Sequence, residues 1–369
     1  MDFALTDTQN GLQELARRIF AEQASQQRLR QLDGSGYYDA DLWRQLAESG
    51  LLGIMLDEAC GGVSEPFETL AVLLEEAGRG VAPVPLLEVL VGGALLLQWA
   101  PRTRESSQAL EALIAGQAMI CAALYEPGQR HWAQVQSRAE RQGNVWRLSG
   151  AKHLVTAADL QGVCWTLAHD GDGLGLFLFD LRADGIESVR QVTTTGEYLF
   201  ALELNDVAAV QLAAGDEALA LVERVELHLM AGCAAMAVGV CGEMTRMAAR
   251  HTSEREQFGK PLATFQAVAH RLADCHIDIE ALRGLTQQAV CRLDQPGSAG
   301  ELVEAVLAAK AFAGEALHRI SHATQQVHGG TGVDRDYPLF RYCLLAKKLE
   351  LAYGSPAEVL QRLGAALVA

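Results

Sequence analysis

The sequence lacks any run of basic residues. Its 369 residues carry 30 lysines and arginines against 46 aspartates and glutamates, which gives a formal net charge of −16 at pH 7. A charge of this sign repels polyanions such as DNA and RNA. We therefore expect no nucleic-acid partner.

Cysteines are present, but never at the spacing of a metal site. The eight cysteines are scattered among mostly apolar neighbours, without a C-x-x-C pair or a Cys/His cluster. We expect no metal, and we interpret the cysteines as small core residues in a reducing compartment. The sequence also lacks H-E-x-x-H, paired catalytic carboxylates and a Ser-His-Asp arrangement.

Long hydrophobic runs are absent as well. The most apolar stretch, PLLEVLVGGALLLQWA, is interrupted by Glu88 and two glycines, so it is too short and too broken to cross a bilayer. The first ten residues are acidic and amphipathic, unlike a signal peptide. We therefore expect a cytoplasmic protein without a membrane partner.

The aromatic content is low, and it favours helices over an all-β fold. Aromatic residues make up 6% of the chain, while Leu and Ala dominate. Thr6 with Gln9 predicts a capping box, and apolar residues follow at helical spacing. From about residue 119 the period changes to alternation, with Gly143-Asn144 as a hairpin turn and GVCWTLAH, LGLFLFDL and LFALELNDV as strands.

Long amphipathic helices return in the last part of the chain. We predict helices over roughly 216–252, from Pro261 onward, and from a second capping box at Ser298 and Glu301 into the glycines after His328. Short connections between such helices indicate a bundle. The predicted domains are an N-terminal α-helical domain over 1–118, a middle β domain over 119–214 and a C-terminal four-helix bundle over 215–369.

The stretch QQVHGGTGV, residues 325–333, places three glycines within four residues. Such a turn sacrifices backbone order, which is costly unless another group must approach closely. It follows a helix rather than a strand, so it is not a Rossmann fingerprint. One interpretation is a helix C-cap with Gly329 in the left-handed conformation. The other is a turn whose backbone amides approach a phosphate.

A second stretch, SEREQFGKPLATFQAVAHRLAD at 253–274, favours the phosphate-binding interpretation of the glycine turn over the helix C-cap. Arg255 precedes an aromatic-glycine turn, and an arginine fork at a helix end suits a pyrophosphate. Together with the glycine turn, this stretch resembles the acyl-CoA dehydrogenase family. LGIMLDEACGGVSEPFETLAVLLEEAGRGVAPVPLL resembles the N-terminal domain of its bacterial members that act on bulky, steroid-like acyl chains. The resemblance spans nearly the whole chain and implies a mainly α fold with a middle β-barrel or sandwich.

The resemblance also implies a cofactor and partners. In this family FAD lies between the β domain of one subunit and the C-terminal bundle of its neighbour. FAD takes the hydride of the acyl-CoA, and an electron-transferring flavoprotein accepts the electrons from the reduced FAD. Thr156 matches a position against the flavin ring. The positions that match contacts to the neighbour's FAD are Arg255, Phe258, Gln266, Gln326, Val327, His328, Gly329 and Gly330.

The sequence departs from the family at the catalytic base. The usual glutamate position holds Tyr353, and the alternative position on the first long C-terminal helix holds Leu229. A neutral phenol is a poor base near pH 7. Glu350 and Glu226 each lie about one helical turn before these positions and are candidates for a displaced base, although helix carboxylates are more often solvated or ion-paired.

The β domain departs from the family where the resemblance places the chain's own flavin. LYEPGQRHWAQV keeps Glu126 but then continues with Arg130, His131 and Trp132, where the family has small residues. Leu154 occupies the position of a tryptophan that lies against the flavin ring. The chain thus keeps the elements that reach a neighbour's FAD and loses those that build its own site.

Three hypotheses follow from this pattern. The leading one is a base-less partner subunit of an α2β2 enzyme, which contributes FAD contacts in trans to a sister subunit. The second is a self-sufficient homotetrameric acyl-CoA dehydrogenase with a displaced catalytic carboxylate. The third is a flavin-free thioester-binding scaffold protein.

Overall fold

Helices fill the chain up to residue 114 in the computed structural model, which describes residues 4–129, 131–295 and 297–368. The predicted capping box begins the first helix. The Thr6 hydroxyl accepts the N–H of Gln9, and the Gln9 side-chain oxygen accepts the N–H of Thr6. The N-terminal helices are α1 (Asp7–Gln23), α2 (Gln26–Gln31), α3 (Ala40–Glu48), α4 (Phe67–Gly80), the π-helix η3 (Leu87–Ala94), α5 (Leu95–Trp99) and α6 (Arg104–Ile114).

Strands follow from Met119 onward. The predicted turn at Gly143-Asn144 joins two of them, since Gln142 pairs with Val145 across it. The strands Met119–Ala123 and Ile186–Val192 were not predicted individually. In the second of them six of the seven residues are exposed, and no apolar alternation marks it. The strands are β1 (Met119–Ala123), β2 (Arg138–Gln142), β3 (Val145–Thr156), β4 (Gly162–His169), β5 (Leu174–Asp180), β6 (Ile186–Val192) and β7 (Tyr198–Ala214).

The strands close on themselves. β4 pairs with β2, β2 with β3, β3 with β7, β7 with β5, and β5 with β4 again. The β2–β4 junction is narrow, with the single pair Arg138–His169 in parallel register. β1 adds to β4 in parallel and β6 adds to β7 antiparallel. The result is a barrel of mixed strands around fully buried residues such as Phe177, whose ring meets that of Trp146 on β3.

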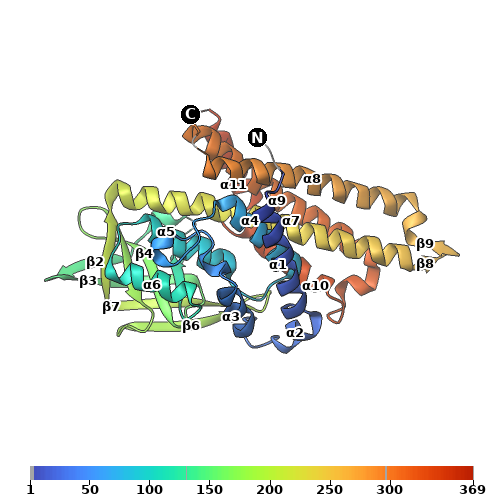
Figure 1. The fold of residues 1–369 in the computed structure, drawn as a ribbon. Coiled ribbons are helices and arrows are strands. Elements are labelled where there is room, and N and C mark those ends of the chain that lie inside the picture. The colour runs from blue at the N-terminus through green and yellow to red at the C-terminus, as the bar shows by residue number, and fades with distance from the viewer. Residues whose placement is uncertain (1–3, 130, 296, 369) are drawn as a thin grey trace. The chain divides into compact units, whose positions relative to one another are not determined.

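Long helices form the last part of the chain. α8 and α9 lie side by side, and α10 and α11 both pack on α9 (Figure 1). The helix predicted from Pro261 begins later, at Gln266, because 262–264 form a 3-10 turn. The elements are α7 (Gly215–Glu254), β8 (Glu256–Gln257), β9 (Lys260–Pro261), α8 (Gln266–Asp294), α9 (Ala299–His328), the 3-10 turn η6 (Gly329–Val333), α10 (Leu339–Leu351) and α11 (Pro356–Ala366).

Helix α7 is the one described helix that is long and apolar enough to cross a membrane by length and composition. The most apolar part of α7 is 83% buried inside the fold, so it is a core helix. A glycine on each helix allows α7 and α4 to approach each other very closely. A Cβ on Gly239 would lie 1.9 Å from the carbonyl oxygen of Glu75, and one on Gly78 would lie 2.3 Å from that of Met236.

The chain groups into two compact units that are not contiguous in sequence. One contains α1, α2, α4 and everything from Met230 onward, and the other contains Leu32–Glu65 and Val84–Leu229. α1 and α4 join the C-terminal helices because α1 packs on α4 and α4 packs on α8. The boundaries of these two units differ from the boundaries between helical and strand regions. Secondary structure changes from helix to strand at Met119 and back to helix at Gly215.

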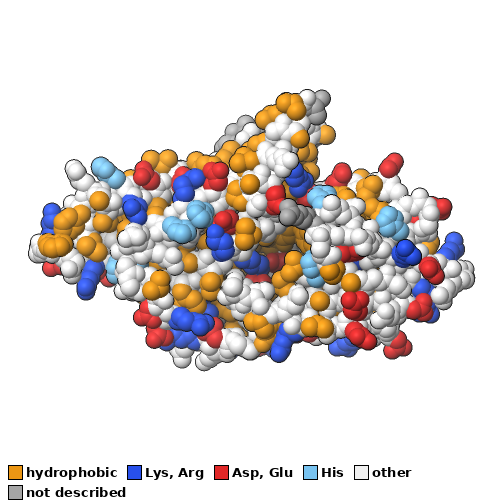
Figure 2. Space-filling view, turned by 180° about the vertical axis from the view of Figure 1, so that it is seen from behind, with side chains coloured by type: hydrophobic (Ala, Val, Ile, Leu, Met, Phe, Trp, Pro, Cys, Tyr) orange, Lys and Arg blue, Asp and Glu red, His pale blue; other side chains and the backbone are white. Residues whose placement is uncertain are grey.

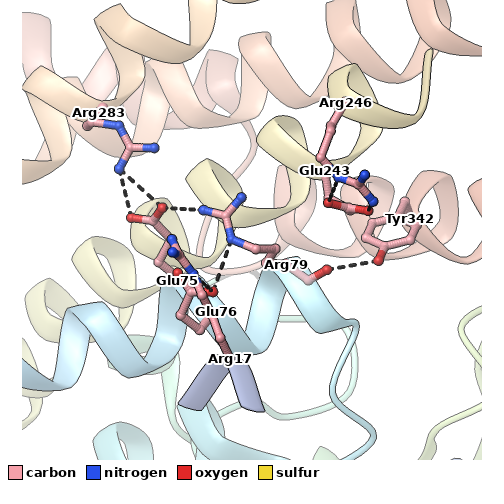
Figure 3. Close-up of polar contacts among 8 residues, drawn as sticks. All are labelled: Arg17, Glu75, Glu76, Arg79, Glu243, Arg246, Arg283 and Tyr342. Carbon is pink, nitrogen blue, oxygen red and sulfur yellow. Dashed lines mark hydrogen bonds and ion pairs between the residues drawn. The ribbon is translucent and has the colours of Figure 1, made fainter. Parts of the chain in front are cut away.

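Ion pairs reinforce the first of these units (Figure 3). Glu76, which is 1% exposed, accepts from Arg17 of α1 at 3.0 Å and from Arg79 at 3.1 Å. Its neighbour Glu75 accepts from Arg79 at 2.7 Å and from Arg283 of α8 at 2.9 Å. A buried carboxylate is costly unless it is paired, so these contacts specify how α1, α4 and α8 pack together.

Candidate functional site

A cavity of about 650 Å³ lies where α7 ends, α8 begins and α9 runs into the glycine turn. All of its lining residues belong to the unit that contains the chain from Met230 onward. Phe258 and Gln266 do not line it, but most of the residues predicted to reach a neighbour's FAD do. The lining residues are His251, Arg255, Leu262, Ala267, Val268, Arg271, Gln326, Val327, His328, Gly329, Gly330 and Thr331.

The glycine turn ends α9, but not in the left-handed conformation that was one of the two interpretations. Gly329 has φ 60° and ψ −136°, a combination that residues with a Cβ rarely adopt. A Cβ on Gly329 or Gly330 would meet no atom within 4 Å, whereas one on Gly332 would lie 2.9 Å from the carbonyl oxygen of Gln325. Gly332 therefore serves packing, while Gly330 faces open space that a ligand can enter.

His328 holds this turn in place. Its Nδ1 lies 2.7 Å from the carbonyl oxygen of Thr324, which can only accept, so Nδ1 carries the proton and Nε2 accepts from the Tyr337 hydroxyl at 3.1 Å. The ring stacks on His251 with centroids 4.4 Å apart. Burial lowers the pKa of both imidazoles, so both are neutral at pH 7. These contacts give His328 a structural role.

Arg255 follows directly after α7 and is fixed through its backbone. Its N–H donates to the His251 carbonyl at 2.8 Å, and its carbonyl accepts from the Leu262 N–H at 2.9 Å. The side chain is exposed, lines the cavity and makes no ion pair with any residue that the structure describes. The guanidinium is therefore available to an anion in the cavity.

Phe258 and Gln266 are exposed next to the cavity. Phe258 occupies the tip of the β8–β9 hairpin with φ 55°, an uncommon conformation for a bulky residue, and is 93% exposed. Gln266 is the first residue of α8 and points to solvent. A strained, fully exposed aromatic residue at a hairpin tip is typical of a contact with a group outside the chain.

Tyr353, at the usual base position, lies in the turn between α10 and α11 with φ 57°. A lysine that sequence reasoning missed holds this turn. The fully buried Nζ of Lys310 donates to the carbonyl oxygens of Leu349 at 3.3 Å, Glu350 at 3.2 Å and Gly354 at 3.0 Å. The only sequence signal for this contact is a lysine on the otherwise apolar face of α9.

The two candidates for a displaced base have partners. The Glu350 carboxylate pairs with Lys347 and lies 3.5 Å from His318. Glu226 is 7% exposed, and its Oε1 lies 4.0 Å from Nε2 of His131. His131 Nδ1 accepts the N–H of Ala133, so a neutral His131 carries its proton on Nε2, which faces Glu226.

Leu229, at the alternative base position, is buried in apolar surroundings. It is 2% exposed, and a Cβ on Gly92 of the π-helix would lie 3.5 Å from it in ordinary van der Waals contact. One residue earlier, His228 is also buried, and its Nδ1 donates to the Arg224 carbonyl at 2.7 Å. Burial lowers the pKa of His228 to about 4, so this histidine is a neutral core residue near pH 7.

In the β domain, the segment after β1 is held by a buried ion pair. Glu126 accepts from Lys152 at 2.6 Å, from the Ser137 hydroxyl at 2.6 Å and from the Gln136 N–H at 2.7 Å. Burial opposes the charge of Glu126, but these bonds outweigh it and lower the pKa of the carboxyl. Of the bulky residues that follow, Arg130 lies outside the described residues.

The positions matched to the flavin ring lie at the end of β3. Thr156 is the last residue of the strand, is half-buried and pairs with Leu199 of β7. Leu154, at the tryptophan position, is 49% exposed and has φ 56° at a register shift between Lys152 and Val155. Leu154 thus has a strained backbone conformation, but it lacks the flat aromatic side chain that the tryptophan position would supply.

The cavity fits the adenosine diphosphate part of a dinucleotide better than a neutral ligand. Its cations, Arg255 and Arg271, have no acidic partner among the described residues, and Gly330 leaves room for close approach. On the face shown in Figure 2, acidic and basic side chains are interspersed. Cationic forks next to open backbone amides are well suited to phosphate oxygens.

Comparisons with known proteins identify the family of the chain. Residues 6–117 match the N-terminal domain of acyl-CoA dehydrogenases, and residues 227–367 match their C-terminal domain. The acyl-CoA dehydrogenase FadE27 of Mycobacterium tuberculosis is 31% identical, over 99% of this chain and 98% of its own length.

Two solved structures extend the similarity to bacterial heteromers. A variant of the Tcur3481–Tcur3483 steroid ACAD is 40% identical with a TM-score of 0.89, covering 98% of this chain and 97% of that one. The ChsE4–ChsE5 complex from Mycobacterium tuberculosis is 29% identical with a TM-score of 0.91, covering 100% and 99%. With the fold and both helical ends matched, this chain belongs to the acyl-CoA dehydrogenase family of flavoprotein oxidoreductases.

Proposed function

We propose that this chain is the base-less subunit of a heteromeric acyl-CoA dehydrogenase and that its C-terminal cavity binds the FAD of a sister subunit. The observation that carries the proposal is the contrast between two regions. The cavity offers the unpaired Arg255 and the open Gly330. The two base positions hold Tyr353 and the buried Leu229, and neither side chain takes a proton readily at pH 7.

The chain's own residues have binding roles in this proposal. Bound FAD supplies the hydride acceptor for the acyl β-carbon. Arg255 binds the diphosphate through its fork, the turn at Gly329 and Gly330 provides close backbone contact, and Val327 and Val268 exclude water from the adenosine side. The sister subunit supplies the carboxylate that removes the α-proton.

The two related heteromers support a bulky acyl-CoA thioester as substrate. One of them is described as a steroid acyl-CoA dehydrogenase and the other as a two-protein complex. We propose the same type of assembly here, an α2β2 complex that passes its electrons to an electron-transferring flavoprotein. The cationic cavity argues against the flavin-free scaffold, because such a protein has no need for unpaired guanidinium groups facing an open glycine turn.

The homotetrameric alternative depends on Glu226, since the carboxylate of Glu350 is engaged by Lys347. Glu226 is buried beside His131, which is the observation in its favour. Changing Glu226→Gln and Glu350→Gln separately distinguishes the two functions. We expect unchanged turnover of the heteromer in both variants, whereas a loss of at least a hundredfold in one of them would identify that residue as the base.

The trans role is tested by Gly330→Val in a complex with a sister subunit that carries the glutamate base. A Cβ at this position meets no atom of this chain within 4 Å, so we expect the chain to fold and assemble but the complex to lose most of its flavin. Gly11→Val in α1, where a Cβ also meets no atom within 4 Å, is the matched control and keeps its flavin. Full flavin content in the Gly330→Val complex would contradict the proposal.

A further inference from the structure

Two guanidinium groups, rather than one, face the cavity. Arg271 lies on α8 three residues after Val268 and four after Ala267, which places all three on one face of the helix, and all three line the cavity. We propose that Arg271 is a second diphosphate-binding residue, so that Arg255 and Arg271 form a two-arginine clamp for the dinucleotide. This inference rests on the proposed function, because it assigns a further role within the same cavity.

The pairing of the other arginines supports this assignment. The chain is strongly acidic, and arginines in the same unit are commonly neutralised by carboxylates. Arg255 and Arg271 are among those with no ion pair to any residue in the described ranges, as are Arg18, Arg250 and Arg335, but Arg255 and Arg271 are the two that line the cavity. The paired arginines of that unit include Arg17, Arg79, Arg246, Arg283, Arg292 and Arg319.

The charge at the cavity requires both arginines. α7 and α9 end here and α8 begins here. With roughly half an elementary charge at each helix end, the three helices together contribute about −0.5. Arg255 alone brings the total to about +0.5, and Arg271 raises it to about +1.5. His251 and His328 are neutral, so they add nothing at pH 7. The two negative charges of a dinucleotide diphosphate are therefore nearly balanced only when both arginines take part.

The clamp belongs entirely to this chain, which makes it testable without a partner. All lining residues lie in one unit. The isolated protein should therefore bind ADP, which carries the adenosine and diphosphate of FAD, and the affinity should fall steeply with ionic strength. Adenosine has no phosphate, so it reports the contacts of the nucleoside alone.

The experiment is isothermal titration of the isolated protein with ADP and with adenosine. For Arg271→Ala we expect the Kd for ADP to rise about ten- to a hundredfold, as for loss of a charge-assisted hydrogen bond, and the Kd for adenosine to stay the same. Arg271→Lys keeps the charge but loses the guanidinium fork. Its Kd for ADP should therefore lie between those of the unchanged protein and of Arg271→Ala. Arg18→Ala removes an exposed guanidinium from α1, outside the cavity, and leaves ADP binding unchanged.

The possible results separate the clamp from the proposed function. If Arg255→Ala weakens ADP binding and Arg271→Ala does not, the clamp is wrong while the trans site stands. If neither variant changes ADP binding, the two-arginine clamp and the proposed trans site are both wrong. An equal loss of adenosine and ADP binding in Arg271→Ala would show a packing role and overturn the clamp.

The diphosphate of coenzyme A is the other source of the same chemistry. In the heteromer, Arg271→Ala should lower the flavin content and leave the KM for acyl-CoA unchanged. A raised KM with full flavin content would assign Arg271 to the thioester and overturn the inference.

Discussion

The buried Lys310 gives the sharpest test of how the turn that contains Tyr353 is held. Lys310→Met keeps a long unbranched side chain in the same space, so it leaves little cavity. It removes three hydrogen bonds to carbonyl oxygens, two of which involve groups that are only partly buried. Each bond from a charged donor contributes about 1.5–3 kcal/mol.

Two effects reduce the loss. The methionine spares the several kcal/mol that burial of an ammonium group costs, and water reaches the partly buried carbonyls once the turn loosens. We therefore expect a net loss of about 3 kcal/mol in the free energy of unfolding. The same change at the exposed Lys347, which pairs with Glu350 on the surface of α10, should cost less than about 1 kcal/mol.

The assay is urea unfolding followed by far-ultraviolet circular dichroism, together with hydrogen exchange of the amides at 352–355. Lys310→Met should lower the midpoint and speed exchange in this turn, while Lys347→Met should do neither. A loss below about 1 kcal/mol for Lys310→Met, or unchanged exchange at 352–355, would refute the argument that this lysine holds the turn.

Three further predictions concern a histidine, a glycine and the hairpin tip. Unfolded His228 takes up a proton near pH 6.5 but the folded one only near 4, so between pH 7 and 5 stability should fall by about 2 kcal/mol; His228→Phe should abolish this part of the pH dependence of the urea midpoint. Gly239→Ala places a Cβ 1.9 Å from the Glu75 carbonyl oxygen and should cost at least about 2 kcal/mol in urea unfolding, whereas Gly11→Ala should cost nothing. Phe258→Ser removes a side chain that is 93% exposed, so it should leave the midpoint unchanged and reduce the flavin content of the heteromer.

Local patterns in the sequence predicted much of the fold. The Thr6 capping box and the Gly143-Asn144 turn depend on neighbours in sequence, so the residues themselves specify them. The second predicted capping box shows the limit of such patterns. Ser298 accepts the N–H of Glu301 as expected, but the Glu301 carboxylate pairs with Arg292 at 2.9 Å, because a cation from α8 competes for it.

The candidate site was predictable where short motifs carry it and not where the fold assembles it. Arg255 and the glycine turn stand in recognisable stretches. Arg271 became a candidate only because the start of α8 turns that face toward the cavity. Lys310 and Lys152 are buried lysines whose acceptors lie at least fifteen residues away in sequence, and no local pattern indicates such partners.

Whether this chain completes the flavin site of a sister subunit is tested by its flavin-to-protein ratio, measured by absorbance after denaturation, alone and in complex with that subunit. We expect little flavin on the isolated chain and about one flavin per two chains in the complex. A ratio near one flavin per chain in the isolated protein would contradict this expectation, because the chain would then complete a flavin site without the sister subunit.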